Sequence, residues 1–539
     1  MSSFRTTFSR GAQGAVAGLL SGYTALAVAE LTASLVRPQA GPVNVVGGAA
    51  IDRTPPALKD YAIRTFGEND KLVLQLGILA TLGFLAAVLG VLSLRHRRTG
   101  AAGVLLFGMV GAAAALTRPD TRGPADALPS LAGVLAGAAV LYFLAGVLAG
   151  AAVLYFLAGK VTKQPVLDTG TGDGGSLWSR RGFLATASVT AVAATTVGAL
   201  GRTLIGMRGQ GAVASRAAVK LPAPASPALP LPAGVQLKTE GISPFTTSNK
   251  DFYRVDTALV VPKVDTDSWR LRIHGKGVTR PHTYTFQELL TRPLIERDIT
   301  LTCVSNEVGG PYVGHARWLG VRLADLLREC GVKPPSKGGP ADQLVARSVD
   351  GMTLGSPVDD VMDGRDAMLA VGMNGVPLPF EHGFPVRMLV PGLYGYVSAC
   401  KWIEDIELTT FDAYDPYWVK RNWARKAPIK TQARIDTPKP FARPTGETVM
   451  VAGVAWAQHR GITRVEIRID DGPWQDTDLA PQANTDTWRQ WSYPWNPTPG
   501  GHHLTVRATD GTGQAQTEQR TRTIPDGASG WHSVFVTTG

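Results

Sequence analysis

The apolar residues of this chain are concentrated in its first two hundred positions. Five long runs there are rich in Ala, Leu, Val and Gly, and short polar or charged stretches separate them. The runs cover residues 11–36, 72–94, 101–116, 131–159 and 183–206. A helix needs about 20 apolar residues to cross the hydrocarbon core of a bilayer, so the third run is the marginal one. The pattern predicts a membrane region of about five transmembrane helices over residues 1–206.

Positive charge between these runs predicts how they cross the membrane. Lys and Arg precede the first run and lie between the second and third and between the fourth and fifth runs: Arg5, Arg10, Arg95, Arg97, Arg98, Lys160, Lys163, Arg180 and Arg181. Cytoplasmic loops carry an excess of these residues, so we expect the amino terminus in the cytoplasm. Because the number of spans is odd, we expect a multi-pass protein of the cell membrane whose chain after residue 206 is extracytoplasmic.

The fourth run contains a perfect tandem repeat. Residues 133–145 read GVLAGAAVLYFLA, and residues 146–158 repeat these letters. Two copies make the predicted helix longer than a bilayer core requires, so it must tilt, protrude or kink. Each copy contains a G-x-x-x-G motif, which can let helices approach closely. The pattern assigns no further role to the repeat.

The fifth run opens with Ser179-Arg180-Arg181-Gly182-Phe183-Leu184 and continues with small residues. This segment, residues 179–206, resembles an internal twin-arginine export signal, a route that carries folded domains loaded with cofactor. Two ordinary cytoplasmic arginines are the alternative. Whether the segment is cleaved stays open.

After the last run the pattern becomes that of a soluble protein. Residues 207–240 alternate Pro with Ala and Leu, which favours an extended linker. Residues 241–427 predict an α+β domain, because short β-like runs alternate with helical ones. The β-like runs are 269–274, 299–303, 368–373, 386–390 and 403–408, and the helical runs are 286–291 and 323–330. Residues 428–539 alternate apolar and polar positions between turn signals, which predicts an all-β sandwich.

Composition and charge exclude several classes. The net charge of +11 over 539 residues is scattered, without the dense Lys/Arg clusters typical of nucleic-acid binding. Three widely spaced cysteines do not form a disulfide framework. The chain also lacks C-x-x-C, C-x-x-C-H and H-E-x-x-H, which argues against a c-type haem, a cysteine-ligated iron–sulfur cluster or a zincin site here.

Cys303 is the cysteine with the most suggestive surroundings. It follows an apolar β-like run and precedes the turn residues Asn306, Gly309 and Gly310. A thiolate at the end of a strand, held by a tight turn, suits a soft or borderline metal. A half-buried structural cysteine is the alternative.

Several motifs in a fixed order resemble the sulfite oxidase family of molybdopterin-dependent oxidoreductases. They are Leu301-Thr-Cys303-Val-Ser-Asn306, Ala316-Arg317-Trp318-Leu-Gly320-Val-Arg-Leu-Ala-Asp325, and the run from Val371 through Asn374-Gly-Val-Pro-Leu-Pro379-Phe-Glu-His382 and Arg387-Met-Leu-Val-Pro391 to Lys401-Trp402. The resemblance extends from about residue 240 to the carboxyl terminus. It implies a sulfite-oxidase-like α+β molybdopterin domain followed by an immunoglobulin-like dimerisation domain.

The resemblance implies a role for each matching residue. Cys303 is expected to be the thiolate ligand of molybdenum, and Arg317 to supply positive charge for catalysis. The residues expected to hold the molybdenum–molybdopterin cofactor are Asn249, Phe252, Tyr253, Asp325, His382, Arg387, Ser398 and Lys401. A guanidinium suits the cofactor phosphate because it is permanently charged and bidentate. The implied chemistry is the transfer of one oxygen atom and two electrons to or from a small substrate.

Two departures leave the substrate open. Animal sulfite oxidases place arginines directly after the cysteine loop, where this chain has Glu307-Val-Gly-Gly310, and Trp423 stands where they have a tyrosine. A methionine-sulfoxide-type reductase of the same fold is therefore the alternative to sulfite oxidation. Without a haem in the chain, electrons must pass through a separate cytochrome or quinone-linked partner. A cofactor-free, membrane-anchored interaction protein and a transporter are the alternatives from other classes.

Overall fold

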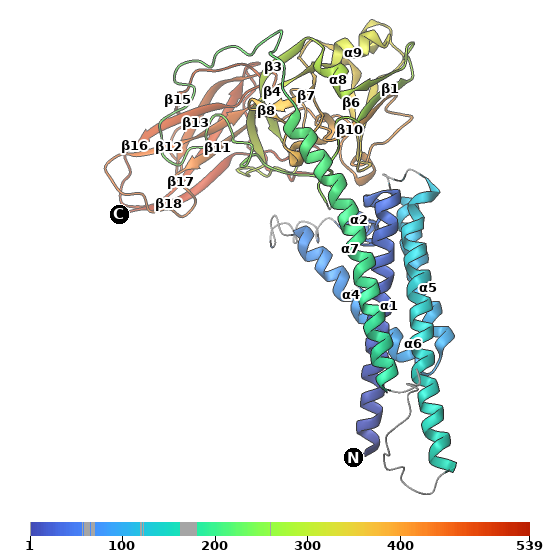
Figure 1. Cartoon of the computed structure of the whole chain (residues 1–539). Coiled ribbons are helices and arrows are strands. Elements are labelled where there is room, and N and C mark those ends of the chain that lie inside the picture. Colours follow the sequence, from blue (N-terminus) through green and yellow to red (C-terminus); the bar gives the residue numbers. More distant parts are fainter. Residues whose placement is uncertain are drawn as a thin grey trace. The chain divides into compact units, whose positions relative to one another are not determined.

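The computed structural model describes residues 2–55, 58, 65, 70–118, 121, 123–161, 180–258 and 260–539. It contains two compact units. The first comprises Met1–Gln210 with Thr257–Val260, and the second comprises Gly211–Asp256 with Val261–Gly539. The first unit is helical, and the second carries the β-sheets (Figure 1).

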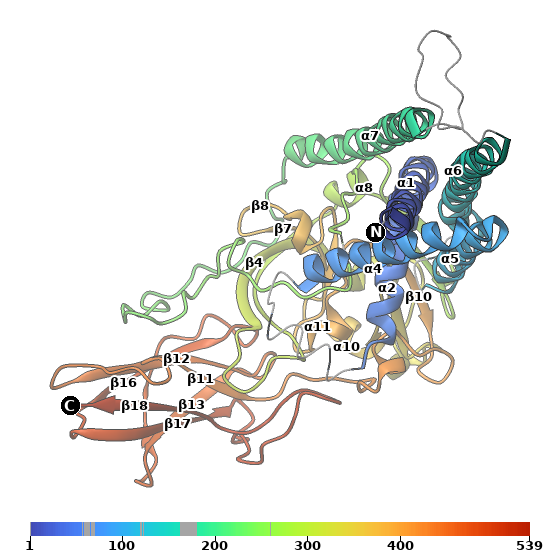
Figure 2. The same ribbon diagram turned by 90° about the horizontal axis from the view of Figure 1, so that it is seen from below.

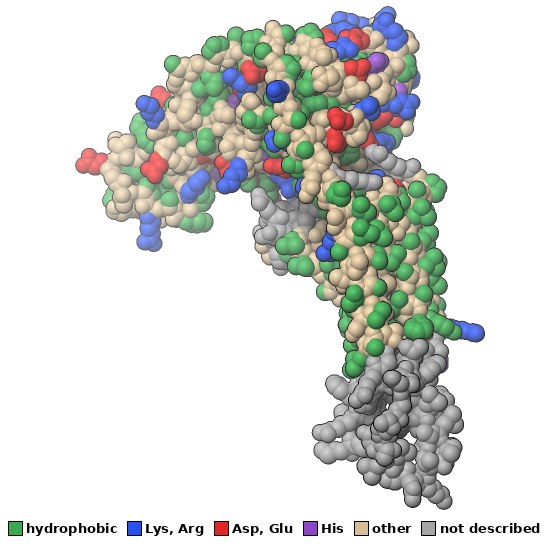
Figure 3. Space-filling model, in the orientation of Figure 1, with side chains coloured by type: hydrophobic (Ala, Val, Ile, Leu, Met, Phe, Trp, Pro, Cys, Tyr) green, Lys and Arg blue, Asp and Glu red, His purple; other side chains and the backbone are tan. Residues whose placement is uncertain are grey.

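Long helices build the first unit. They are α1 (Ser2–Val36), α2 (Pro42–Arg53), α4 (Asp70–Ser93), α5 (Arg97–Thr117), α6 (Leu128–Val161) and α7 (Arg180–Ala218). Among the described residues, five helices are long and apolar enough to cross a membrane. Hydrophobic side chains cover much of the visible surface of this unit (Figure 3); Phe84 of α4 and Val189 of α7, for example, are each 69% exposed. The predicted twin-arginine segment begins outside the described residues, because Ser179 and the side chains of Arg180 and Arg181 are not among them.

Small residues set how closely the helices approach. A Cβ atom placed on Gly133 of α6 would lie 2.4 Å from the carbonyl oxygen of Ala25 on α1. One turn further along, Ser21 of α1 donates a hydrogen bond to the carbonyl oxygen of Gly137. The first G-x-x-x-G of the repeat therefore packs against α1, as the motif predicts. The side chains of the second copy lie outside the described residues.

We expect Gly133→Leu to destabilise this unit, because its side chain has no room against the α1 backbone. Overpacking of this kind costs about 1–3 kcal/mol, so the melting temperature in detergent should fall by several degrees. Gly206→Leu on α7 is the matched control, since no described atom lies within 4 Å of a Cβ placed there. Equal melting temperatures for the two variants would contradict the close α1–α6 contact.

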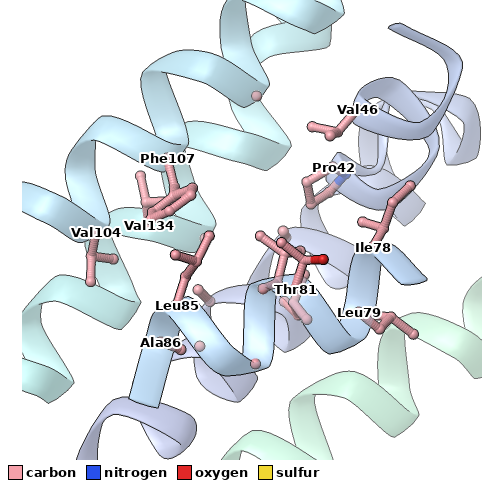
Figure 4. Close-up of a pocket in the computed structure, with 18 of the residues that line it drawn as sticks. Pro42, Val46, Ile78, Leu79, Thr81, Leu85, Ala86, Val104, Phe107 and Val134 are labelled. Atoms are coloured by element: carbon pink, nitrogen blue, oxygen red, sulfur yellow. The ribbon is translucent and has the colours of Figure 1, made fainter. Parts of the chain in front are cut away.

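A cavity of about 810 Å³ lies among α1, α2, α4, α5 and α6. Its walls are almost entirely apolar, and Val46, Ile78, Leu85, Phe107 and Val134 point into it (Figure 4).

The expected linker differs from the structure in two respects. Helix α7 continues to Ala218, twelve residues into the segment 207–240. The extended part then pairs with a strand, because Ser226 N donates to Leu294 O at 3.1 Å and Glu296 N donates to Ser226 O at 2.9 Å. Residues 219–232 thus lack helix, as the prolines predict, but Ser226 is hydrogen-bonded to residues 294 and 296 rather than free. The sequence pattern could not show this, because a proline-rich segment can use the backbone groups of its other residues to pair with a sheet edge.

The α+β domain contains two sheets of five strands. One has the order β2-β1-β10-β5-β6, with β2 (His282–Thr285), β1 (Arg270–Gly275), β10 (Ile403–Thr409), β5 (Gln343–Ser348) and β6 (Thr353–Pro357). The other contains β3 (Leu294–Thr302), β4 (Val313–Arg322), β7 (Met368–Met373) and β8 (Val376–Pro377), with β9 (Arg387–Leu389) paired to β7. The short helices are α8 (Phe286–Leu290), α9 (Leu323–Glu329), α10 (Val358–Met362) and α11 (Gly395–Ser398). All seven runs predicted in this domain correspond to observed strands or helices within a few residues.

The last 112 residues form a β-sandwich, as the alternating pattern predicts. One sheet has the order β11-β12-β16-β15, with β11 (Gln432–Thr437), β12 (Val449–Trp456), β16 (Arg489–Trp495) and β15 (Asp478–Leu479). The second has the order β14-β13-β17-β18, with β14 (Gln475–Asp476), β13 (Ile462–Ile469), β17 (Gly500–Asp510) and β18 (His532–Thr538). The two layers lie face to face (Figure 2). Their inward-facing side chains, such as Val451, Ile467 and Val506, form one buried core.

Candidate functional site

Cys303 lies at the first position after β3, in a loop that its own motif closes. Its backbone N–H donates to the carbonyl oxygen of Tyr312 at 2.9 Å. Asn306 N donates to Cys303 O, and the Asn306 side chain accepts from Tyr312 N at 2.8 Å. The asparagine of this Cys-x-x-Asn pattern therefore has a structural reason, because its side chain ties the start of the loop to its end. The predicted position of Cys303 at a strand end is confirmed.

The thiol of Cys303 has a polar but desolvated environment. Its Sγ lies 2.9 Å from Ser305 Oγ. Burial raises the pKa of the Cys303 thiol, although Ser305 and the positive charge of Lys401 act in the opposite direction. The thiol form is therefore favoured at neutral pH, and a bound cation would favour its deprotonation.

A second group of residues converges from three distant segments. His382 Nε2 lies 2.9 Å from Asn249 O, and Asn374 Nδ2 donates to Asn249 Oδ1 at 2.8 Å. Phe252 stacks on Tyr253 at 5.2 Å between ring centroids and meets His382 edge-on at 5.6 Å. Burial lowers the pKa of His382 to about 4, so its ring is neutral at pH 7. With Nε2–H donating to the carbonyl of Asn249, Nδ1 remains a hydrogen-bond acceptor.

Two buried cations complete this cluster. Arg387 is 6% exposed, and its Nε has no hydrogen-bond partner among the described residues. Its Nη1 reaches only the carbonyl oxygen of His382, at 3.3 Å, and its guanidinium lies 5.1 Å from the Trp318 ring centroid. Burial lowers the pKa of Arg387 to about 10 and that of Lys401 to about 8, the latter despite an ion pair with Asp256 at 2.7 Å.

The positive charges of Arg387 and Lys401 are suited to binding an anionic group. A buried charge without a full set of partners costs free energy, and a phosphate would supply the missing acceptors for Arg387. The neutral His382, the amide of Asn249 and the flat rings of Phe252 and Tyr253 add hydrogen-bonding and stacking surfaces. The residues present therefore fit a pterin that carries a phosphate, and the Cys303 thiol fits a metal bound beside it.

Three predicted site residues have other roles in the structure. Arg317 pairs with Asp298 at 2.7 Å and lies opposite it in the β3–β4 register. Val313 is opposite Thr302, so Arg317 lies four residues, about 13 Å, further along β4 from the cysteine. The motif is contiguous in sequence, but the direction of the strand carries this arginine away from Cys303.

Asp325 and Ser398 also differ from expectation. Asp325 is 51% exposed on α9 and pairs with Arg322 and Arg328, so its contacts lie outside the cluster. The Ser398 hydroxyl is fully buried and donates to the carbonyl oxygens of Leu393 and Tyr394, which satisfies the turn before Lys401. Its role here is to shape the backbone.

Two polar residues of the cluster, Asn374 and Asp256, were not predicted as site residues from the sequence. Asn374 has a left-handed backbone (φ 50°), and its side chain connects Arg317 N with the Asn249 loop. The Asn374-Gly375 pair was a readable turn signal, but not a cofactor signal. Asp256, the partner of Lys401, had no signal in the sequence, because only the fold brings residues 145 positions apart together.

Two parts of the chain match known protein families. Residues 258–418 match the family model of an oxidoreductase molybdopterin binding domain, and residues 432–506 match a bacterial Ig domain. Mitochondrial sulfite oxidase of Mus musculus is 28% identical over 297 residues, covering 48% of this chain and 53% of its own. Sulfite oxidase of Gallus gallus is 30% identical over 293 residues, covering 46% and 62%. The chain thus spans about half the length of the curated relatives it matches.

A solved structure is also similar. The sulfane dehydrogenase SoxCD of Paracoccus pantotrophus is 24% identical, with a TM-score of 0.47, over 54% of this chain and 81% of that chain. The family resemblance expected from the motifs and the expected immunoglobulin-like domain are both confirmed by the family models and the sulfite oxidase relatives. Residues 258–418 are therefore a molybdopterin-binding oxidoreductase domain, similar to that of the sulfite oxidases.

Proposed function

We propose that this chain is a membrane-anchored, extracytoplasmic oxidoreductase that transfers an oxygen atom at a molybdenum held by Cys303. The observation that carries the proposal is a thiol at a closed strand-end loop whose pKa is influenced by the charge of Lys401, together with the buried Arg387, whose Nε has no hydrogen-bond partner among the described residues. The five long apolar helices support the anchor. The cofactor supplies the two-electron oxygen-atom chemistry when bound.

The protein's own residues hold and orient the cofactor. Arg387 and Lys401 supply the positive charge for its phosphate. His382, neutral at pH 7, offers Nδ1 to a pterin N–H while its other nitrogen is held by Asn249. Phe252, 4% exposed, and Tyr253 exclude water from this side. Cys303 supplies a thiolate at the position set by the loop.

The loop after Cys303 bears on the charge of the proposed substrate. A Cβ atom placed on Gly309 would lie 2.2 Å from the His532 ring, so no side chain fits there. The neighbouring position is Gly310, and the loop therefore supplies no arginine at these two positions for an anionic substrate. The missing arginine supports a neutral oxygen donor, such as a sulfoxide, as a second candidate substrate in addition to sulfite.

Metal and pterin analysis of detergent-extracted protein tests the class. We expect about one molybdenum and one pterin per chain, in a host that loads related enzymes. Sulfite and several sulfoxides, each with artificial electron acceptors and donors, then test direction. Turnover only with a reducing dye and a sulfoxide would replace the oxidase by the reductase. Absence of both metal and pterin would favour the cofactor-free interaction protein.

The remaining partners are proposals that follow from the architecture. We propose a separate cytochrome or quinone-linked electron partner, because the sequence carries no c-type haem motif. We also propose a homodimer formed through the immunoglobulin-like domain. Light scattering that gives the mass of one chain, after correction for detergent, would contradict the dimer. Protease accessibility in intact cells, with the wall removed, tests the proposed orientation of residues 211–539.

Retention of the cofactor should depend on pH through Lys401. Burial lowers the pKa of Lys401 to about 8, so its charge is present below that pH and lost above it. We expect the affinity for an anionic pterin to fall between about pH 7 and pH 9, by at most tenfold per pH unit for one proton. Pterin release, followed by fluorescence after dilution, measures the effect. In Lys401→Met this pH dependence should disappear; an unchanged profile would assign it to another group.

A further inference from the structure

The strand that leads to Cys303 has a buried polar face. Side chains alternate along a strand, and Ile299 and Leu301 of β3 lie in an apolar cluster with Trp318. Thr300 and Thr302 point the other way, yet they are only 1% and 2% exposed. Something other than solvent must therefore satisfy their hydroxyl groups.

The immunoglobulin-like domain, residues 428–539, supplies partners for both threonines, in addition to His315 of β4, whose Nδ1 lies 3.3 Å from Thr300 Oγ1. Gln458 is fully buried, and its Nε2 donates both to Thr300 O and to Thr302 Oγ1, each at 2.9 Å. Trp488 N donates to Thr300 Oγ1 at 2.8 Å. Thr302 directly precedes Cys303, so the Gln458 amide holds the residue next to the one that carries the thiol.

The same domain also pairs with the free edge of β3. This strand is at the end of its sheet, where backbone groups need partners. Thr300 N donates to Asp486 O at 2.9 Å, and Asn484 Nδ2 donates to Asp298 O at 3.0 Å. The loop 484–488 therefore substitutes for a neighbouring strand beside β3.

The far side of the cysteine loop contacts this domain as well. Arg434 of β11 donates from Nη1 to Gly310 O at 2.8 Å. The His532 ring occupies the space beside Gly309, which has φ +80° and accepts no Cβ there. The segments before and after Cys303 are thus both held by residues of the immunoglobulin-like domain.

We propose that Gln458 is a positioning residue for Cys303, and that the immunoglobulin-like domain is a structural part of the cofactor site. The proposal rests on the proposed function in taking Cys303 as the metal ligand. Its physical basis is that an unmade hydrogen bond at buried Thr300 and Thr302 is unfavourable, so loss of Gln458 loosens the segment that carries the thiol. The Gln458 amide oxygen has no partner among the described residues, so the interaction depends on its two donor contacts.

Gln458→Met tests this, because methionine keeps the length and loses both donors. Gln516→Met is the matched control, since Gln516 is also buried but its contacts lie within the sandwich, to Ala508, Gln432 and Gly530. The cofactor-free protein is alkylated, and modification of Cys303 is followed by mass spectrometry. We expect at least about tenfold faster alkylation of Cys303 in Gln458→Met, and less than twofold change in the control.

Hydrogen exchange of the peptide containing Thr302 to Tyr312 provides a second readout, because Cys303 N–H is bonded to Tyr312 O. Faster exchange is expected there in Gln458→Met only. If that variant does not fold, Thr302→Val removes one of the two contacts from the other side. Alkylation and exchange equal to wild type in a folded variant, or equal changes in the control, would overturn the proposal.

The two proposals fail separately. These readouts use cofactor-free protein, so they test positioning whether or not molybdenum binds. In loaded protein we expect a lower molybdenum-to-pterin ratio for Gln458→Met than for the control. If Cys303 reacts faster in Gln458→Met but wild type binds no metal, the positioning role of Gln458 is supported and the proposed function is contradicted.

Discussion

Cys303→Ala is expected to abolish turnover while leaving the pterin bound. The fall in kcat should be about 10³-fold or more, the scale seen when a group acting directly at the reacting centre is removed. Pterin is retained because its expected contacts, from Arg387, His382 and Lys401, do not involve the thiol. The molybdenum-to-pterin ratio and the activity of the same preparation are measured together.

Cys330→Ala is the control for this experiment. Cys330 is a buried free cysteine at the end of α9 that lies against Tyr284. Its replacement should lower stability slightly and leave the metal content unchanged. If Cys303→Ala retained full molybdenum and activity, the thiol would not be the ligand, and the half-buried structural cysteine would become the better interpretation.

Arg387→Met is expected to have opposite effects on cofactor binding and on folding. The guanidinium is buried, and part of its hydrogen-bonding capacity is unused. Removing it should therefore raise the free energy of unfolding of the cofactor-free protein by about 1–3 kcal/mol. Because the pKa is lowered only to about 10, the arginine is charged at pH 7, and this stabilising effect is present throughout the neutral range. Pterin content should fall below about a tenth of wild type.

Arg365→Met distinguishes this effect from the loss of an ordinary buried arginine. Arg365 is similarly enclosed, but it pairs with Asp360 and Asp363. Its replacement should destabilise the protein, since two carboxylates lose their partner, and should leave pterin content near normal. Thermal unfolding of cofactor-free protein and pterin fluorescence of loaded protein measure the two effects. A destabilised Arg387→Met that keeps its pterin would contradict an anion site at this position.

Several features of the fold were predictable because they depend on neighbours in sequence. The amphipathic and apolar periods of the chain predict the long helices and seven of the strands and helices of the α+β domain. The position of Cys303 after β3 also follows from local pattern. Asn306 belongs to the same motif, and its side chain closes the loop by accepting a hydrogen bond from Tyr312 N, six residues away.

Predictions that relied on contiguity within a motif were less successful. Arg317 and Asp325 stand close to Cys303 in sequence, but β4 carries the first about 13 Å along the sheet, and α9 exposes the second to solvent. Residues 219–240 have the extended composition of a linker, yet Ser226 pairs with β3. The direction of β4, the exposed face of α9 and the edge of β3 decided these three outcomes.

The sequence by itself determined the long apolar helices, the order of the molybdopterin-binding and immunoglobulin-like domains, the resemblance to sulfite oxidases and the cysteine loop. These depend on residue type, period and short spacing. Only the tertiary structure decided which distant residues share one buried site: Asn249 with His382, Asp256 with Lys401, and Gln458 with the strand before Cys303. The physical reason is that buried polar groups must find partners wherever the chain brings them, and chain folding sets those pairings over separations of more than a hundred residues.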